Sequence, residues 1–295
     1  MLLKRGEKLF IVFNEEGYTY GNCILVDDDI RLVIDSGAGR ELAKVQPEKV
    51  DILINTHHHY DHVRGNKFFT RAQILLHPVE RISIKSVEKV MAIDGWNQLM
   101  PQDLYNRERV EEGVEPNSLT EEWRVDGEIN DGQVIDCGST KFMVLHTPGH
   151  SKGHCAFYFP EEDLAFLGDI CLTKVGPWYG EAHTDPGELI ASIDRIIELN
   201  PAAVVTSHVN QIVDNPRPVL REYRDRILKR EQRILKQLRE SPQTIDQLAE
   251  KHLIYREHPS MPVLFWEKSM IRNHLERLVK LGLAEELDEG VFKAV

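Results

Sequence analysis

The chain has 295 residues and a mass of 34.0 kDa, more than one domain usually holds, so we expect one large domain and a smaller one. Hydrophobic residues make up 41% and charged residues 28%, as in globular proteins, and no apolar run approaches the roughly 20 residues that span a bilayer. The net charge of −12 argues against general affinity for nucleic acid, which depends on Lys and Arg contacts to phosphate.

The N-terminal segment and the cysteines bear on the compartment in which the protein acts. The apolar stretch at residues 9–13 is too short for a secretory signal sequence. Four cysteines are spread along the chain without a CxxC pair, namely Cys23, Cys137, Cys155 and Cys171. This spacing favours reduced thiols over a disulfide framework. We therefore expect a cytoplasmic protein without a membrane partner.

Short segments rich in β-branched and aromatic residues alternate with turn-forming residues along most of the chain up to residue 206. They predict strands at 8–13, 19–26, 31–35, 51–56, 72–76, 141–146, 154–159, 164–167 and 203–206. A helix is expected at 186–199, with Asp185 as its N-cap and Pro186 in its first turn. This mixture predicts a layered α/β or α+β domain in which helices cover sheets.

Residues 83–130 follow a different pattern. The stretch is acidic, lacks strand alternation and carries three large aromatic residues, Trp96, Tyr105 and Trp123. One interpretation is a helical insertion whose aromatic side chains pack inward. The other is a cap that lines the entrance for a substrate.

The charge distribution changes near residue 220. Residues 1–220 carry a net charge of −14, whereas residues 221–295 carry +2. This step supports a domain boundary, so we predict a large domain at 1–220 and a small one at 221–295.

The C-terminal region has a helical pattern. Apolar residues recur at helical spacing, with Glu231 as an exception, at Leu220, Tyr223, Ile227, Ile234 and Leu238. Two further helices are expected at 245–251 and 266–280, followed by a hairpin at 283–295. Three helices and a terminal hairpin resemble a winged helix-turn-helix.

The most informative motif is the HxHxDH segment at residues 57–62, directly after the strand predicted at 51–56. Just past a strand the chain is still extended, so successive side chains alternate in direction. His57, His59 and Asp61 should therefore face one way, while His58 and Tyr60 face the other and anchor the loop. Imidazole and carboxylate groups are ligands that suit zinc, iron or manganese. The motif therefore predicts a metal site.

Three other segments place a histidine or an aspartate directly after a predicted strand. They carry His150, Asp169 and His208. Loops that follow neighbouring strands can meet at one edge of a sheet, where their side chains could complete a shell of metal ligands. The candidate ligands are then His57, His59, Asp61, His62, His150, Asp169 and His208.

Taken together, these residues resemble the motif set of the metallo-β-lactamase superfamily, over residues 1 to about 215. The resemblance implies a four-layer αββα sandwich that holds two metal ions at the sheet edges. It assigns the first ion to three histidines, His57, His59 and His150. It assigns the second ion to Asp61, His62 and His208. The carboxylate of Asp169 would bridge both ions, as in glyoxalase II-like hydrolases, lactonases and nucleases, whereas antibiotic-hydrolysing members generally lack that bridge.

The expected chemistry is metal-assisted hydrolysis. Two divalent ions, zinc by preference and iron or manganese as alternatives, would yield a bridging hydroxide at neutral pH. We expect this hydroxide to attack the carbonyl of a small ester, thioester or lactone. Asp61 would orient the hydroxide and carry its proton to the leaving group. Tyr179 would stabilise an oxyanion, and Trp178 would line the pocket.

Two other histidine and aspartate positions are expected near the metals without binding them. His154 should be structural or contact a ligand, and Asp35 should make a turn beneath the site with hydrogen bonds to the ligands. His183 has a weaker case for lining the pocket.

The order of a lactamase-like domain and a winged helix also resembles that of some endoribonucleases. Under this alternative the protein is a metal-dependent endoribonuclease or phosphodiesterase, and the winged helix guides nucleic acid. The charge of −14 over residues 1–220 favours the small substrate instead. The C-terminal domain would then close one side of the pocket or mediate a homodimer.

Overall fold

The computed structural model describes residues 1–81, 92–93, 95–100, 124–288 and 290–295. The insertion expected at 83–130 therefore lies largely outside the described residues, together with Tyr105 and Trp123. Within it, Trp96 belongs to the short helix α3 (Trp96–Leu99) and is buried. Its ring centroid lies 4.6 Å from that of Phe265, so this one aromatic side chain packs inward.

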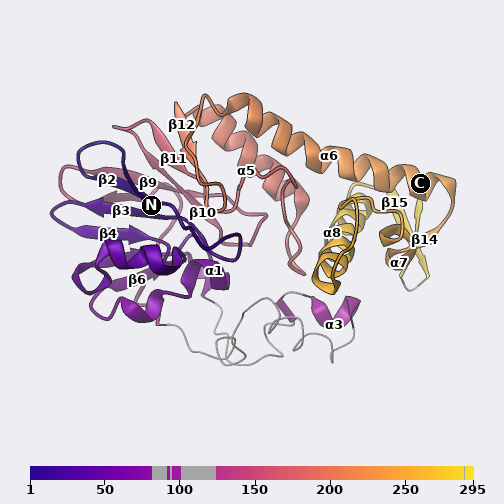
Figure 1. Cartoon of the computed structure of the whole chain (residues 1–295). Helices are drawn as coiled ribbons and strands as arrows, with labels where there is room; N and C mark the ends of the chain where they lie inside the picture. The colour runs from indigo at the N-terminus through magenta and orange to yellow at the C-terminus, as the bar shows by residue number, and fades with distance from the viewer. Residues whose placement is uncertain (82–91, 94, 101–123, 289) are drawn as a thin grey trace.

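Two β-sheets pack face to face and form the N-terminal part of the molecule (Figure 1). As far as the structure is described, the first sheet has the spatial order β1 (Leu2–Lys4), β2 (Leu9–Val12), β3 (Cys23–Asp27), β4 (Arg31–Ile34), β5 (Ile52–Ile54), β6 (Gln73–Leu76) and β7 (Gly127–Glu128). The second has the order β13 (Val213–Asp214), β12 (Ala203–Val205), β11 (Leu164–Phe166), β10 (Cys155–Phe159), β9 (Lys141–His146) and β8 (Val134–Asp136).

The apolar residues of both sheets form the core between them. Ile11, Ile24 and Ile34 of the first sheet belong to one buried cluster with Phe157 and Phe166 of the second. All five side chains are 0% exposed. Removing this apolar area from water is the main driving force for stacking the sheets.

Helices cover the outer faces of the two sheets, which completes the α+β sandwich (Figure 1). Leu42 and Val45 of the 3₁₀ helix η1 (Gly39–Val45) pack against the outer face of the first sheet. The helix α5 (Pro186–Leu199) covers the second sheet through a buried stripe that includes Leu189, Ile193 and Ile196. Shorter helical turns lie at η2 (Pro47–Lys49), α1 (Tyr60–Val63), η3 (Asn66–Phe68) and η4 (Pro78–Glu80).

The predicted helix at 186–199 is confirmed at both ends. The Asp185 carboxylate accepts a hydrogen bond of 2.7 Å from the backbone N–H of Gly187, and Pro186 occupies the first turn. A side-chain acceptor at this position satisfies an N–H group that has no partner within the helix. The residues that start the helix are therefore also the ones that predict it.

The strand predicted at 19–26 begins later than expected, at Cys23. The backbone N–H of Asn14 donates to Asn22 Oδ1 at 2.9 Å, and the side-chain amide of Asn14 donates to the carbonyl of Tyr20 at 3.0 Å. These side chains hold residues 14–22 as a loop in place of ladder bonds. Asn is typical of such turns because its amide competes with regular structure.

The C-terminal part consists of three helices and a small sheet. The helices are α6 (Arg217–Glu240), α7 (Ile245–Ala249) and α8 (Met261–Lys280). The sheet, in the residues described, has the order β14 (Gln243–Thr244), β16 (Val291–Ala294) and β15 (Ala284–Asp288). Helix α8 begins at Met261 rather than at Trp266, because Pro262 is compatible with the first helical turn.

Helix α6 runs from the sandwich to the C-terminal elements without interruption (Figure 1), and position 220 falls within it. Its predicted apolar stripe is buried, and the same core cluster contains Ile193 of α5, Ile227 of α6 and Leu275 of α8. The division into a domain at 1–220 and a winged-helix-like domain at 221–295 stays a prediction. None of the helices in the described ranges combines the length and apolar composition needed to cross a membrane.

Strand direction explains how distant loops meet. In the second sheet β9 and β11 are both antiparallel to β10, and β12 is parallel to β11, so β9, β11 and β12 end at the same edge. The loop after β5 of the first sheet is joined to this edge, because the Cys155 N–H donates to the Thr56 carbonyl at 2.9 Å. The four loops with candidate ligands therefore lie together.

Candidate metal centre

A first group of donor atoms forms where the loops after β5, β9 and β11 meet. It comprises one atom each from His57, His59, His150 and Asp169, all within 4.8 Å of one another. His150 Nε2 lies 3.2 Å from His57 Nε2, 3.0 Å from His59 Nδ1 and 3.2 Å from Asp169 Oδ2. Donors about 2.0–2.1 Å from a tetrahedral zinc ion are about 3.4 Å apart, so this spacing suits a cation.

The outer hydrogen bonds of these histidines decide which ring nitrogens carry a proton. His59 Nε2 donates to the Glu181 carboxylate at 2.8 Å, and His150 Nδ1 donates to the Trp178 carbonyl at 3.1 Å. A carboxylate and a carbonyl can only accept, so the lone pairs of His59 Nδ1 and His150 Nε2 point at each other. Burial lowers the pKa of His59 to about 4 and that of His150 to about 3, so both rings are neutral near pH 7. Converging lone pairs repel unless a cation lies between them.

A second group of donors lies beside the first and comprises Asp61, His62, Asp169 and His208. His62 Nε2 is 3.1 Å from Asp169 Oδ1, and His208 Nε2 is 3.3 Å from the same oxygen and 3.2 Å from Asp61 Oδ2. Both His62 Nε2 and Asp169 Oδ1 are buried without a hydrogen-bond partner. Orphaned buried atoms of this kind are costly, and a bound cation would satisfy them.

Asp169 joins the two groups. Its Oδ2 faces His150 in the first group, whereas its Oδ1 faces His62 and His208 in the second. The side chain is buried, and the nearby histidine charges outweigh the effect of burial and lower the pKa of its carboxyl group. The donor set therefore fits two divalent cations that share one carboxylate.

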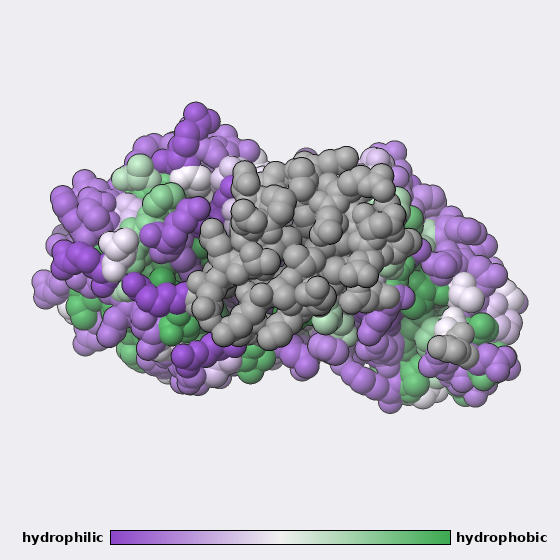
Figure 2. Space-filling view, turned by 90° about the horizontal axis from the view of Figure 1, so that it is seen from below, coloured by the Kyte–Doolittle hydropathy of each residue, from purple (hydrophilic) through white to green (hydrophobic). Residues whose placement is uncertain are grey.

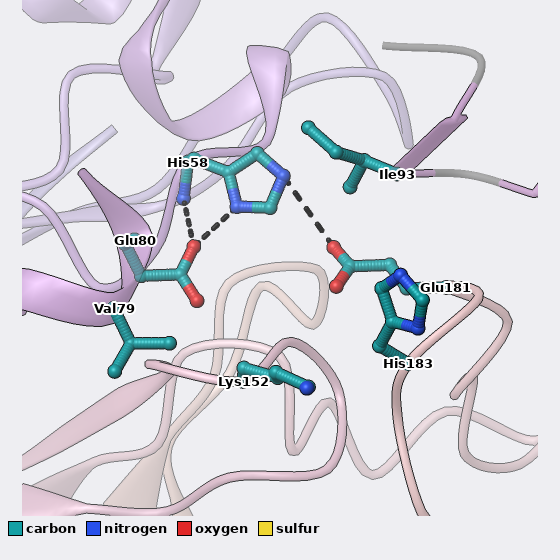
Figure 3. Close-up of a pocket in the computed structure, with 7 residues that line it drawn as sticks. All are labelled: His58, Val79, Glu80, Ile93, Lys152, Glu181 and His183. Atoms are coloured by element: carbon teal, nitrogen blue, oxygen red, sulfur yellow. Dashed lines mark hydrogen bonds and ion pairs between the residues drawn. The ribbon is translucent and has the colours of Figure 1, made fainter. Parts of the chain in front are cut away.

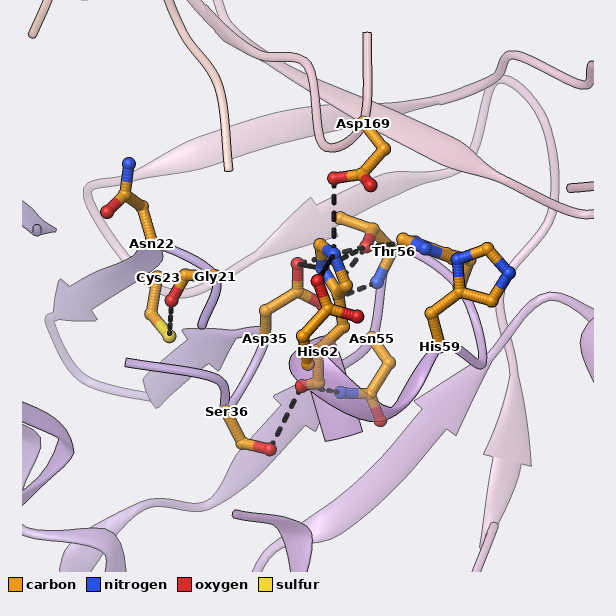
Figure 4. Close-up of polar contacts among 12 residues, drawn as sticks. Gly21, Asn22, Cys23, Asp35, Ser36, Asn55, Thr56, His59, His62 and Asp169 are labelled. Atoms are coloured by element: carbon orange, nitrogen blue, oxygen red, sulfur yellow. Dashed lines mark hydrogen bonds and ion pairs between the residues drawn. The ribbon is translucent and has the colours of Figure 1, made fainter. Parts of the chain in front are cut away.

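Asp35 and Thr56 support the second group from below (Figure 4). The Asp35 carboxylate accepts from His62 Nδ1 at 2.8 Å and from the Thr56 N–H at 2.8 Å. This bond orients the His62 ring so that its Nε2 is aimed at Asp169. Asp35 has a φ of 62°, the left-handed region, so the backbone is strained where this carboxylate is placed.

His154 lies beneath the shared carboxylate. Its Nε2 accepts from the backbone N–H of Asp169 at 3.0 Å, and its Nδ1 lies 3.1 Å from the Thr147 carbonyl. Burial lowers the pKa of His154 to about 3, which keeps the ring neutral and able to accept. The ring thus contacts the backbone of Asp169 and lies outside both donor groups.

His58 belongs to neither of the two donor groups and forms polar contacts with two glutamates (Figure 3). Its Nδ1 and its backbone N–H both bond to Glu80 Oε2, and its Nε2 is 3.4 Å from Glu181 Oε1. Glu80 also accepts from Ser151 Oγ at 2.7 Å, so it ties the His57–His62 loop to the loop of His150. Sequence reasoning missed both glutamates, because neither belongs to a motif or a periodic pattern.

The same region contains a pocket (Figure 3). His58, Glu80 and Glu181 line it together with Lys152 and His183. His58, His59 and Glu181 also form a third cluster that could hold a cation. His183, which the sequence only weakly suggested as a pocket residue, thus lines a pocket beside the first donor group.

Aromatic side chains flank both donor groups. The Trp178 ring centroid is 5.2 Å from that of His150 and 5.5 Å from that of His59. On the other side, Tyr18 stacks on His208 at 4.7 Å, a contact the sequence did not predict. Tyr60 packs with Arg64, whose guanidinium carbon lies 4.9 Å from its ring.

Tyr179 requires a correction. Its side chain is 0% exposed, and its hydroxyl lies 2.9 Å from His274 Nε2 of α8 and 3.3 Å from Arg230 Nη1 of α6. A hydroxyl held in this way is not free to stabilise an oxyanion, so the role expected from the sequence is wrong. The buried partners come from helices more than fifty residues later in the chain, which a local pattern does not reveal.

The sequence of this chain matches those of known hydrolases. The family model described as the metallo-beta-lactamase superfamily matches residues 17–208. A hydroxyacylglutathione hydrolase of Maricaulis maris is 31% identical over 39% of this chain and 31% of its own length. One of Pelagibacter ubique is 26% identical over 54% of this chain and 53% of its own length, so the match spans about half of such relatives or less.

A solved structure shares the fold over nearly the whole chain. The metallo-beta-lactamase family protein of Thermus thermophilus superimposes with a TM-score of 0.73 at 21% identity, and the match covers 98% of this chain and 99% of that one. The fold agreement therefore extends to the C-terminal elements. With the family model matching well over half of its residues, the chain belongs to the metallo-beta-lactamase superfamily.

Proposed function

We propose that the protein is a metal-dependent hydrolase that cleaves a small thioester, ester or lactone at a dinuclear centre. The observation that carries the proposal is the carboxylate of Asp169, whose two oxygens face two separate groups of donors. The relatives called hydroxyacylglutathione hydrolases favour a thioester among these substrates.

His57, His59 and His150 would hold one ion, and Asp61, His62 and His208 the other, with Asp169 shared. We propose zinc, because imidazole and carboxylate donors suit it and no sulfur ligand is among them. Two such ions supply a Lewis acid for the carbonyl oxygen and lower the pKa of a bound water to about 7.

Asp61 is the group we assign to proton transfer. Its side chain is 26% exposed, more than that of any other candidate ligand, whereas those of His62, His208 and Asp169 are 0%, 2% and 8% exposed. Its Oδ2 lies toward His208, so Oδ1 is the atom we propose to accept a proton from water and release it to the leaving group.

The residues around the centre suit a compact substrate. Trp178 beside the first donor group and Tyr18 beside the second offer aromatic surface for an acyl group and a leaving group. The charge of −14 over residues 1–220 opposes a long polyanion. All four cysteines are buried and unpaired, which supports a reducing compartment such as the cytoplasm.

The proposal is tested by a substrate screen on the zinc-reconstituted protein. The panel contains an acylglutathione thioester, a simple aryl ester, an acyl lactone and a short RNA. We expect turnover of a carbonyl substrate and a decrease in kcat of about 10²- to 10⁴-fold in Asp61→Asn. Asp136→Asn, which alters an exposed carboxylate paired with Lys141, should keep full activity.

Two results would contradict the proposal. One is cleavage of the RNA with no turnover of any carbonyl substrate. The other is full activity in Asp61→Asn while both ions stay bound, since proton transfer would then use another group.

A further inference from the structure

The loop at residues 177–184, which follows Asp169, supplies the partners of two candidate metal ligands. We call it the support loop. The Trp178 carbonyl accepts from His150 Nδ1 at 3.1 Å, and the Glu181 carboxylate accepts from His59 Nε2 at 2.8 Å. These two bonds fix the ring orientation of both histidines. The position of the loop therefore controls the geometry of the first donor group.

Helix α8 of the C-terminal part holds the support loop through Asn273, whose side chain is 1% exposed. Asn273 Nδ2 donates to the Tyr179 carbonyl at 2.7 Å and to the Glu181 carbonyl at 2.8 Å. It also lies 3.0 Å from Thr184 Oγ1. Because carbonyls only accept, the amide must present its nitrogen to the loop.

Other residues of α6 and α8 also hold the support loop. Arg230 of α6 donates to the Pro177 carbonyl at 2.6 Å, and the ring of His274 bonds to the Tyr179 hydroxyl. Arg272 fixes the Asn273 amide, since its Nε donates to Asn273 Oδ1 at 3.1 Å. Arg230, Asn273 and His274 are all at most 3% exposed, so these bonds form away from water, where an unpaired group is costly.

From these contacts we propose that Asn273 is a positioning residue of the metal centre. It acts through the support loop, so that Glu181 and the Trp178 carbonyl aim His59 and His150 at the first ion. A residue of the C-terminal part, more than ninety positions after Glu181 in the chain, thereby helps to orient the metal ligands. The inference rests on the dinuclear centre proposed above.

The buried polar side chains of α8 form hydrogen bonds within the protein rather than with solvent or a ligand. Ser269, Arg272, Asn273 and His274 would be available to a ligand if this helix faced solvent, yet all four are buried. Their partners lie in the protein: Asn273 and His274 bond to the support loop, and Arg272 Nη1 lies 3.3 Å from Gln98 Oε1. These side chains are thus committed to internal contacts.

The test measures metal affinity without substrate. Zinc affinity is determined by competition with a chromophoric chelator, and cobalt(II) is used as a spectroscopic probe of ligand geometry. We expect Asn273→Ala to weaken the binding of one of the two ions about 10- to 100-fold and to shift the visible cobalt(II) bands. The far-UV circular dichroism should stay that of the parent.

A matched control on the same helix separates positioning from stability. Glu267 is 0% exposed, and its carboxylate accepts from the backbone N–H groups of Leu253 and Tyr255, at 2.8 Å each, without touching the support loop. Glu267→Gln should lower the unfolding temperature but leave both zinc affinities within about twofold of the parent. Thr184→Val replaces Asn273→Ala if the latter does not fold, because Thr184 Oγ1 also bonds to the Glu181 carbonyl, at 3.1 Å.

A double-mutant cycle tests whether Asn273 influences the metal site through Glu181. If Asn273 acts through Glu181, then Asn273→Ala should weaken zinc binding much less in a Glu181→Ala background than in the parent. Additive losses, or folded Asn273 and Thr184 variants with unchanged affinities and cobalt(II) spectra, would overturn the inference. A parent protein that binds two ions but hydrolyses no carbonyl substrate would overturn the proposed function instead.

Discussion

A single hydrogen bond can decide which nitrogen of a histidine is free to bind a cation. The carboxylates of Asp35 and Glu181 and the carbonyl of Trp178 each take one ring N–H, from His62, His59 and His150. The remaining nitrogens then face the donor groups. Support residues should therefore influence metal affinity almost as strongly as the ligands.

Asp35→Ala tests this view at the second donor group. Loss of the bond to His62 Nδ1 should weaken the binding of one ion about 10- to 100-fold and leave the affinity for the other ion unchanged. Chelator competition on the two sites measures the effect. If the variant binds each of the two ions as tightly as the parent does, Asp35 has no role in orienting His62.

Glu80 should make stability depend on pH. Burial by itself raises the pKa of Glu80, but the charge and hydrogen bond of His58, with bonds from Ser151 and Gly153, hold the pKa below its usual value of 4.5. The stabilisation is therefore complete above about pH 5 and is lost as the pH falls below about 4.5.

Glu80→Gln should lower the free energy of unfolding by about 3–5 kcal/mol at pH 7, because it breaks a buried pair. The difference from the parent should shrink between pH 5 and pH 3 in urea titrations. Glu128→Gln, at an exposed pair with Arg81, should stay within about 0.5 kcal/mol. A Glu80→Gln deficit that is constant over this pH range would contradict the argument.

Residues whose chemistry depends on local sequence were predictable, and residues whose partners are remote were not. The HxHxDH motif and the turns after strands led to the seven residues that the structure brings together. Glu80 and Glu181 follow no motif, so only the folded chain reveals them. Tyr179 was assigned to the wrong task because its partners, Arg230 and His274, lie on α6 and α8.

Elements with strong local signals match their predicted ranges. Helix α5 has an N-cap, an early proline and a clear apolar stripe, and strand β9 coincides with residues 141–146. Among the residues that the structure describes, all four edge strands of the two large sheets, β1, β7, β8 and β13, were missed, because each is only two or three residues long and carries no clear alternation. Such short strands depend on pairing with a neighbour rather than on their own sequence.

The N-cap of α5 gives a prediction for this element. Asp185→Ala should lower the free energy of unfolding by about 1 kcal/mol, because the N–H of Gly187 loses its acceptor. Asp185→Asn keeps an acceptor and should differ from the parent by only a few tenths of that value. Urea denaturation measures both variants. An Asp185→Asn loss as large as that of Asp185→Ala would show that the charge matters more than the cap.

The whole molecule combines an acidic sandwich with a C-terminal part whose polar helix face is turned inward. Hydrophilic side chains predominate over the outlying parts of the face seen in Figure 2. The two parts share one core cluster, which includes Tyr179, Ile227 and Leu275. Charge and the fold class were readable from composition and pattern, whereas the packing of α8 against the loop after Asp169 depends on contacts ninety residues apart.

This arrangement predicts weak binding of RNA. A labelled 20-nucleotide RNA should show no saturable change in fluorescence anisotropy with micromolar protein at about 150 mM salt, because few phosphate contacts are available. A basic RNA-binding domain serves as the positive control. Tight binding that falls steeply with rising salt would instead support the nuclease alternative.

Two cations held side by side are the central claim, and anomalous X-ray scattering at the zinc edge tests it most directly. Crystals of the zinc-reconstituted protein should show two peaks about 3.5–4 Å apart, one on either side of the Asp169 carboxylate. The peak between His57, His59 and His150 should vanish in His59→Ala. A single peak in the parent, or peaks remote from Asp169, would contradict the account.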